Sequence, residues 1–272
     1  MEGSWLILAG GGFVAGVLAG ILGIGGGFII VSLLIASNYP FPQAIATSSL
    51  VIIMSSSAGS FYNWRMGYLN LQRVIYLAIP AIIFAPLGAY LTGEIPEYIL
   101  LIIFASFMLI NIALIRLKTS IANKKHESES TKKFNPITSR VITGGLAGFL
   151  AGLLGIGGGV IMVPLQMLLL NEDIKTAVRT SLGVIVAATI SACVFHVVKG
   201  NVLFVPGLIL GISGMVGSQA GTRLLPHMSN SLVSKFFSLF LVSMALFNFW
   251  KAWISYQSLS LSCQCLIDYA FD

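Results

Sequence analysis

The chain has 272 residues, of which 57% are hydrophobic and 9% are charged, and its formal net charge is +6. Ordinary soluble domains contain roughly 25% charged residues, so this composition excludes a soluble globular protein. Apolar stretches of the roughly 17 to 25 residues that a membrane-spanning helix needs recur along the chain. Most of the positive charge lies between these stretches, where it sets membrane orientation and does not indicate nucleic acid binding. The composition predicts a multi-pass protein of the lipid bilayer.

Eight apolar segments follow one another in the sequence, and one long polar, basic stretch separates the fourth from the fifth. We expect a flexible linker at this stretch because it contains few residues that could form a packed core. The segments are 5–36, 43–62, 70–93, 96–117, 139–170, 174–198, 202–224 and 231–254. The pattern predicts an all-α membrane protein made of a first transmembrane repeat (1–117), a linker (118–138), a second repeat (139–254) and a polar tail (255–272).

The two halves repeat each other. Residues 12–33 read GFVAGVLAGILGIGGGFIIVSL and residues 144–165 read GGLAGFLAGLLGIGGGVIMVPL, with 15 of 22 positions identical at a separation of 132. At the same separation, Ala46–Leu50 corresponds to Val178–Leu182, and after one inserted residue Asn63–Gly67 corresponds to His196–Gly200. We conclude that each half is one copy of a four-segment unit.

The centre of each repeat is the motif AG-x-LGIGGG. Glycine weakens a helix and permits positive φ angles. Broken helix in hydrocarbon is tolerated only where it is buried in protein or lines a cavity, and matching breaks in two halves point to a transporter's binding site. A helix that restarts after the break offers unpaired N–H groups to an anion. The glycines predicted to line the site are Gly23, Gly25, Gly26, Gly27, Gly155, Gly157, Gly158 and Gly159.

An alternative role for glycine is tight helix packing, and the spacing of Gly16 and Gly20, like that of Gly148 and Gly152, fits it. Residues 5–36 would form a helix about 48 Å long, against a bilayer core of about 30 Å. The helix is therefore either tilted and broken or folded back as a hairpin. With hairpins the halves are inverted, and 13 of the 15 Lys and Arg residues lie inside, with Lys199 and Lys251 outside. We favour inverted repeats.

Polar side chains near the start of the second segment of each half are further candidates for substrate contact. They are Ser48, Ser49, Thr180 and Ser181, although most serines and threonines in membrane helices simply bond their own backbone or a neighbouring helix. Arg179 is either an anion ligand or a side chain that reaches the interface. His196, which corresponds to Asn63, either carries a coupling proton or is a satisfied structural group.

The glycine motifs at Gly20–Gly27 and Gly152–Gly159, followed by Thr47–Leu50 and Thr180–Leu182, resemble the TauE/SafE family of sulfite exporters and sulfonate permeases. The resemblance covers both halves. It implies a multi-pass carrier of the bacterial inner membrane for a small anion, commonly an oxidised sulfur compound such as sulfite, a taurine-like sulfonate or sulfoacetate. The substrate varies among family members, so the resemblance indicates the class better than the molecule.

The predicted function is that of a secondary transporter of a small anion. No GxxxxGK[ST] loop is present, so we expect the energy to come from a gradient, with coupling to H⁺ or Na⁺ as one option. A channel-like pore and a non-transporting accessory subunit are the alternatives. We expect neither an enzyme nor a cofactor or metal, because the apolar segments contain no paired carboxylates and no His/Cys cluster. The sequence leaves export, uptake and the oligomeric state open.

Overall fold

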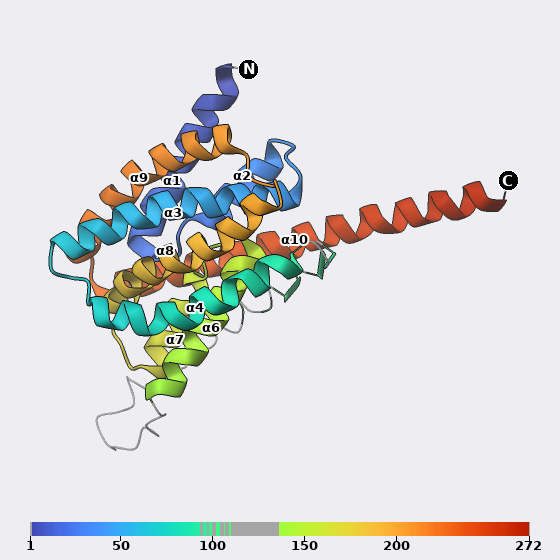
Figure 1. Ribbon diagram of the computed structural model, residues 1–272. Coiled ribbons are helices and arrows are strands. Elements are labelled where there is room, and N and C mark those ends of the chain that lie inside the picture. Colours follow the sequence, from blue (N-terminus) through green and yellow to red (C-terminus); the bar gives the residue numbers. More distant parts are fainter. Residues whose placement is uncertain are drawn as a thin grey trace.

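The computed structural model describes residues 2–92 and 136–271, together with residues 95, 96, 98, 99, 102, 103, 106 and 109. These residues form helices and connecting turns, with no strand among them (Figure 1). The helices are α1 (Glu2–Leu22), α2 (Gly27–Ala36), α3 (Phe41–Arg65), α4 (Leu71–Leu91), α6 (Pro136–Leu154), α7 (Gly159–Leu169), α8 (Ile174–Val198), α9 (Phe204–Leu224) and α10 (Asn230–Phe271), with a short 3-10 helix, η1 (Leu225–His227), before α10. Residues 118–135 of the expected linker lie outside the described residues.

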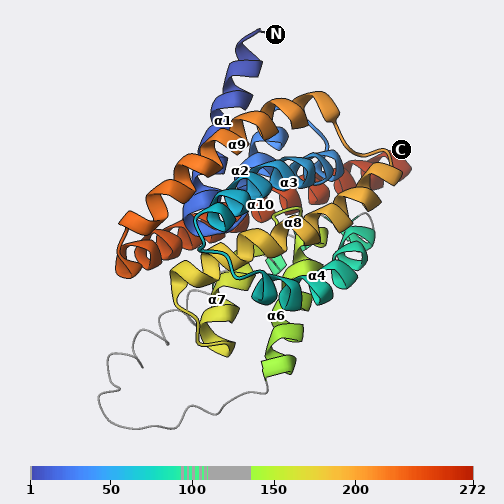
Figure 2. The ribbon, with the colours of Figure 1, turned by 60° about the vertical axis from the view of Figure 1, so that its left-hand side comes forward.

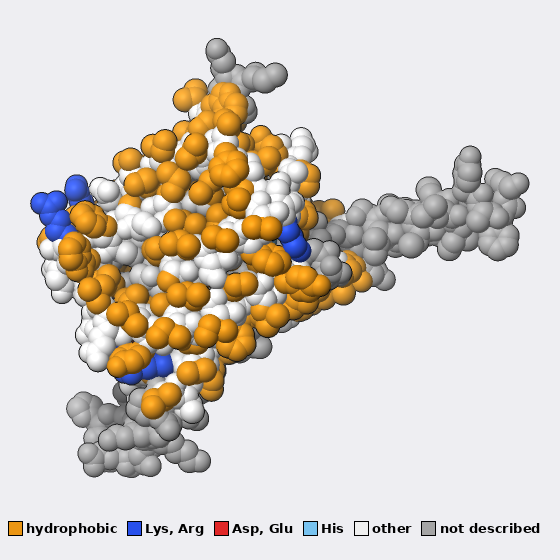
Figure 3. Space-filling model, in the orientation of Figure 1, with side chains coloured by type: hydrophobic (Ala, Val, Ile, Leu, Met, Phe, Trp, Pro, Cys, Tyr) orange, Lys and Arg blue, Asp and Glu red, His pale blue; other side chains and the backbone are white. Residues whose placement is uncertain are grey.

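Seven of the described helices are long and apolar enough to span a membrane, namely α1, α3, α4, α6, α8, α9 and α10. Helices α2 and α7 have 10 and 11 residues. At 1.5 Å per residue they extend for about 15 Å, roughly half of a bilayer core. Hydrophobic side chains cover most of the face shown in Figure 3, and cationic side chains appear only near its margins. Helix α10 continues to Phe271 through residues that were expected to form a polar tail.

The helices of the two halves are interlocked. Helix α1 packs along α9, and α6 packs along α4 (Figures 1 and 2). The first helix of each half therefore lies against the helix that the third apolar segment of the other half forms. The same exchange holds for α3, which packs on α9, and for α8, which packs on α4. Helices α3 and α8 contact each other. The halves therefore cannot act as two independent bundles.

Glycines four residues apart allow the first helices to approach their partners closely. A side chain at Gly16 of α1 would collide with the backbone of Gly214 in α9, and one at Gly20 would collide with the backbone of Ser218. In the second half, Gly148 and Gly152 of α6 meet the backbone of α4 at Ala81 and Ala85 in the same way. The tight packing that the four-residue spacing predicted is present at both crossings.

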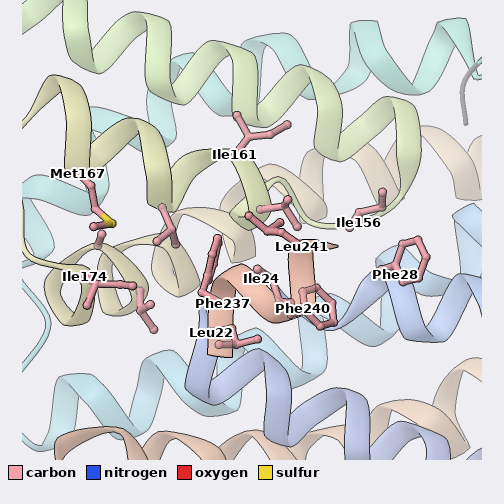
Figure 4. Close-up of a cluster of buried hydrophobic side chains, with 14 of the residues drawn as sticks. Leu22, Ile24, Phe28, Ile156, Ile161, Met167, Ile174, Phe237, Phe240 and Leu241 are labelled. Carbon is pink, nitrogen blue, oxygen red and sulfur yellow. The ribbon is translucent and has the colours of Figure 1, made fainter. Parts of the chain in front are cut away.

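A cluster of buried apolar side chains surrounds the segments that join α1 to α2 and α6 to α7 (Figure 4). Ile24 and Ile156 come from these two segments, and Phe237 and Leu241 of α10 pack in the same cluster. Apolar burial of this kind contributes about 25 cal/mol per Å² of surface removed from water, although a lipid-exposed helix gains less. The cluster holds the two connecting segments inside the protein.

Candidate functional site

The backbone turns sharply at the glycine run of each half. Helix α1 ends at Leu22 and α2 begins at Gly27, and between them Gly23, Gly25 and Gly26 have φ angles of 69°, 80° and 74°. Between α6 and α7, Gly155, Gly157 and Gly158 have φ angles of 62°, 88° and 70°. Glycine adopts such angles without the steric cost that a Cβ atom brings. We call residues 23–26 the first glycine loop and residues 155–158 the second glycine loop.

The two glycine loops meet between α3 and α8. A Cβ atom at Gly27 would lie 2.6 Å from the carbonyl oxygen of Gly155, and one at Gly159 would collide with the carbonyl oxygen of Gly23. Gly25 and Gly157 both face Ile52 of α3 and Ile185 of α8. The loops are thus in direct contact at the centre of the protein, where apolar side chains enclose them.

Each loop leads directly into a short helix whose first turn has no side-chain cap. The N-cap residues are Gly26 for α2 and Gly158 for α7, both in the left-handed conformation. Backbone N–H groups at a helix start carry the positive end of the helix dipole. This end favours an anion, and it needs no charged side chain to do so.

Two of the predicted serines hold the loops of the opposite half. The hydroxyl of Ser48 lies 2.6 Å from the carbonyl oxygen of Gly155 and 2.7 Å from that of Ile45, and it can donate to either. The hydroxyl of Ser181 lies 2.8 Å from the carbonyl oxygen of Gly23 and 2.8 Å from that of Val178. In this conformation, Ser48 and Ser181 fasten each loop to a helix from the other half.

The other two hydroxyls behave differently. Ser49 donates to Ile45 O at 3.1 Å within its own helix, and the side chain of Thr180 is buried in α8. The matching bonds pair Ser48 with Ser181, a separation of 133 residues. A separation of 132 paired Ser49 with Ser181, and this pairing was wrong. The second half has its one inserted residue before the position that corresponds to Ser48. Arg179 consequently corresponds to Ala46 and not to Thr47.

The guanidinium of Arg179 lies over the ring of Tyr68, 4.1 Å from its centroid, in the turn between α3 and α4. The side chain is partly exposed, and its Nε atom is buried without a hydrogen-bond partner among the described residues. His196 is only 2% exposed, and the described residues provide no partner for its Nε2 atom. Asn63, at the equivalent position of α3, is 1% exposed, and its Nδ2 atom likewise has no partner among the described residues.

Four further buried or half-buried hydroxyls were not singled out from the sequence. Ser56 and Ser60 lie on α3 and Ser218 and Thr222 on α9, and none has a hydrogen-bond partner among the described residues. The signal in the sequence is the spacing of Ser56, Ser60 and Asn63, which puts the three on one face of a helix. Helix α3 lies beside α9 only because helices of one half pack on helices of the other half.

Two apolar cavities lie elsewhere in the protein. One of about 540 Å³ is formed by α1, α9 and α10 around Leu18 and Phe236, and one of about 660 Å³ is formed by α4 and α8 around Ile82 and Val194. The residues of the glycine loops line neither cavity.

Cationic side chains gather where α4, α6 and α8 begin. Arg73 forms an ion pair of 3.2 Å with Glu172, and burial raises the pKa of this carboxyl above its ordinary value while Arg73 opposes the shift. Arg140 lies over the ring of Tyr76, and Lys175 donates to the carbonyl oxygen of Pro226 at 3.1 Å. At the other end of α8, Lys199 lies over the rings of Tyr90 and Phe195.

Comparison with known proteins places this arrangement among membrane transporters. Residues 8–248 match the family described as Sulfite exporter TauE/SafE. The chain is 32% identical over 248 residues to the probable membrane transporter protein YunE of Bacillus subtilis, covering 81% of this chain and 88% of YunE. It is 27% identical over 229 residues to a probable membrane transporter protein of Methanocaldococcus jannaschii, covering 78% and 83% of the two chains. The protein is a multi-pass membrane protein that belongs to the TauE/SafE family.

Proposed function

We propose that this protein is a secondary transporter of a small anion, a sulfur oxyanion or an organosulfonate such as sulfite, sulfoacetate or a taurine-like compound. The observation that carries the proposal is the contact between two glycine loops of matching conformation, each leading into an uncapped helix start. Two helix starts supply positive potential inside a protein whose spanning segments contain few charges. An anion bound there would lose its hydration water, and the two helix starts would compensate its charge without a buried cation.

Transport requires that the site open to each side in turn. The hydroxyls of Ser48 and Ser181 fasten the loops in the closed conformation. Release of these two bonds would separate the loops and free both hydroxyls to donate to a substrate. Because α1 packs on α9 and α6 packs on α4, a movement of the group around α1 and α9 against the group around α4 and α6 would change the space between the loops. We propose that the hydroxyls of Thr180 and Ser49 also contact the substrate.

The inverted arrangement of the halves is part of this proposal, and the packing supports it. Gly12 and Gly20 of α1 lie beside Leu210 and Ser218 of α9, so α1 and α9 run in the same direction. Gly59, late in α3, lies near Leu182, early in α8, as expected if these equivalent helices run in opposite directions. With each glycine loop as the tip of a hairpin, the repeats are inverted, and the cations at the starts of α4, α6 and α8 share one side.

A fusion at the C-terminus tests this topology. We expect a reporter that is active only outside the cytoplasm to be active when fused after Asp272, and one fused within 124–133 to be inactive. The opposite pattern would mean that the cation-rich side faces out, and activity of a cytoplasmic reporter at both places would restore parallel halves.

His196 is the candidate for proton coupling, because imidazole titrates near neutral pH and this ring is buried in α8. If it carries the coupling proton, His196→Gln will flatten the pH dependence of flux between about pH 5 and 8. Flux with the wild-type pH dependence would remove His196 from the mechanism and leave Na⁺ coupling or uniport.

Ligand binding by purified protein tests the function itself. We expect sulfite, sulfoacetate or taurine to raise the melting temperature of the wild type, because a ligand stabilises the state that it binds. Gly25→Ala, which places a Cβ atom 3.1 Å from Ile52 at the meeting point of the loops, should reduce the shift, whereas Gly10→Ala, which faces open space, should not. A protein that responds to no anion would contradict the proposal and favour an accessory subunit.

A further inference from the structure

Five buried or half-buried polar side chains lie on α3 and α9, two helices that pack against each other, and we call them the polar stripe. It consists of Ser56, Ser60 and Asn63 of α3 and Ser218 and Thr222 of α9. All except the half-buried Ser60 are at most 1% exposed. Each has a polar atom that finds no hydrogen-bond partner among the described residues. Burying such a group without a partner costs about 1–3 kcal/mol, so five together need an explanation.

On α3 the polar stripe begins one residue after a contact with the first glycine loop. Ser55, directly before Ser56, lies with its hydroxyl 3.4 Å from the carbonyl oxygen of Gly25. Farther along α3, Gly59 lies against α9, where a Cβ atom would be 2.7 Å from Ser218 Oγ and 3.1 Å from Thr222 Oγ1. The absence of a side chain at Gly59 therefore lets α3 approach these two hydroxyls closely. The polar stripe ends near Arg223, whose guanidinium lies 5.3 Å from the centroid of the Tyr62 ring.

The same interface in the other half has no such set of unpaired hydroxyls among its described residues. Thr189 of α8 takes the place of Ser56, and its hydroxyl donates to the carbonyl oxygen of Ile185 at 2.6 Å. Thr92, which follows α4, takes the place of Thr222 and donates to backbone carbonyls, the shortest bond being 2.9 Å to Leu153 O. Ala192 stands where α3 has Gly59. The hydroxyls at the equivalent described positions of α8 and after α4 are thus paired, although Ser139 and Thr143 of α6 are buried without a partner among the described residues.

We infer that the polar stripe is a second binding station for a small oxyanion, next to the glycine loops on the side where α3 and α9 end. This inference rests on the proposed function. Four hydroxyls and the Asn63 amide can all donate, and an oxyanion offers several acceptor oxygens. Neither α3 nor α9 contains an Asp or Glu that would attract a cation. Arg65 and Arg223 in the last turns of these helices offset the negative helix ends.

The binding of sulfite to purified full-length protein in detergent, measured by calorimetry, tests the station. Three substitutions remove donors with little change of shape, namely Ser218→Ala, Thr222→Val and Asn63→Leu. A fourth, Gly59→Ala, removes no donor and presses a methyl group against Ser218 and Thr222, at the position where the other half has Ala192. Each should weaken sulfite affinity, by about tenfold or more where a donor to the charged ligand is lost.

Two matched controls carry hydroxyls that already have partners. Ser213 of α9 donates to Ile209 O and Leu210 O, and Thr189 of α8 donates to Ile185 O. We expect Ser213→Ala and Thr189→Val to bind sulfite with wild-type affinity. The melting temperature of ligand-free Ser218→Ala should be no lower than that of the wild type, because no described residue pairs with this hydroxyl.

The outcomes separate the station from the proposed function. Wild-type sulfite affinity in all four variants would overturn the station while leaving anion transport intact. Equal weakening in the two controls would show general loosening of the helices and would also overturn it. A wild-type protein that responds to Na⁺ but to none of sulfite, sulfate and sulfoacetate would overturn both the station and the proposed function.

Discussion

At a register of 133 residues, α3 carries Ser56, Ser60 and Asn63 where α8 carries Thr189, Cys193 and His196. The backbone features of the two halves are by contrast the same, since each glycine loop has three glycines with positive φ and leads into an uncapped short helix, and each half has a serine bonded to the loop of the other half. The duplicated features are those that hold the loops in place. The features that differ are side chains which could bind or release a charged group, so the two sides of the loops are chemically unlike.

The glycines at the helix crossings should matter equally in both halves, and their replacement should have the largest effect on the protein. Gly16→Leu would push α1 away from the Gly214 backbone, and Gly148→Leu would push α6 away from that of Ala81. Overpacking of this kind costs about 1–3 kcal/mol or more, so we expect both variants to lose folded protein in size-exclusion profiles. Gly10→Leu faces open space and should fold as the wild type does. Loss of folding in only one variant would show that the halves pack differently.

The serines that fasten the loops come next in expected effect. Ser48→Ala and Ser181→Ala each leave a buried loop carbonyl without its cross-half bond, which costs about 1–3 kcal/mol. We expect similar decreases in denaturant midpoint in detergent, and faster hydrogen exchange in the glycine loops. Ser49→Ala is the matched control, because its hydroxyl donates only within α3. If Ser49→Ala is as destabilising as Ser48→Ala, the cross-half bonds do not hold the loops.

Arg179 should show the smallest effect, and it has no arginine counterpart in the first half. Its contact with Tyr68 predicts that Arg179→Ala and Tyr68→Ala each lower stability by about 0.5–2 kcal/mol. The double variant should lose about as much stability as either single variant, because all three lack the same contact. Sulfite affinity should change little, since the guanidinium packs on the Tyr68 ring. A strong loss of affinity in Arg179→Ala, with Arg179→Lys intermediate, would instead identify Arg179 as an anion ligand that leaves Tyr68 during transport.

Much of the architecture could be predicted because the apolar segments and the glycine motif are local patterns. Composition and segment length predict membrane helices, and the repeat indicates two equivalent halves. The contact between Ser48 and Gly155 could not be predicted, because it depends on which half each helix packs against and on a one-residue shift in the alignment. The polar stripe was missed for the same reason, since Ser218 and Thr222 are ordinary residues of α9 until α3 lies beside them. The side chain of Arg179 could be assigned to Tyr68 only once the turn after α3 was placed.

Flux of sulfite into liposomes that contain the purified protein tests the central claim most directly. We expect saturable uptake that is accelerated by unlabelled sulfite inside the liposomes, as is typical of a carrier with one site open to each side in turn. Gly25→Ala should reduce this exchange and Gly10→Ala should not. Flux that rises without saturation and shows no exchange would contradict the carrier in favour of a pore, and flux equal to that of empty liposomes would contradict transport of sulfite.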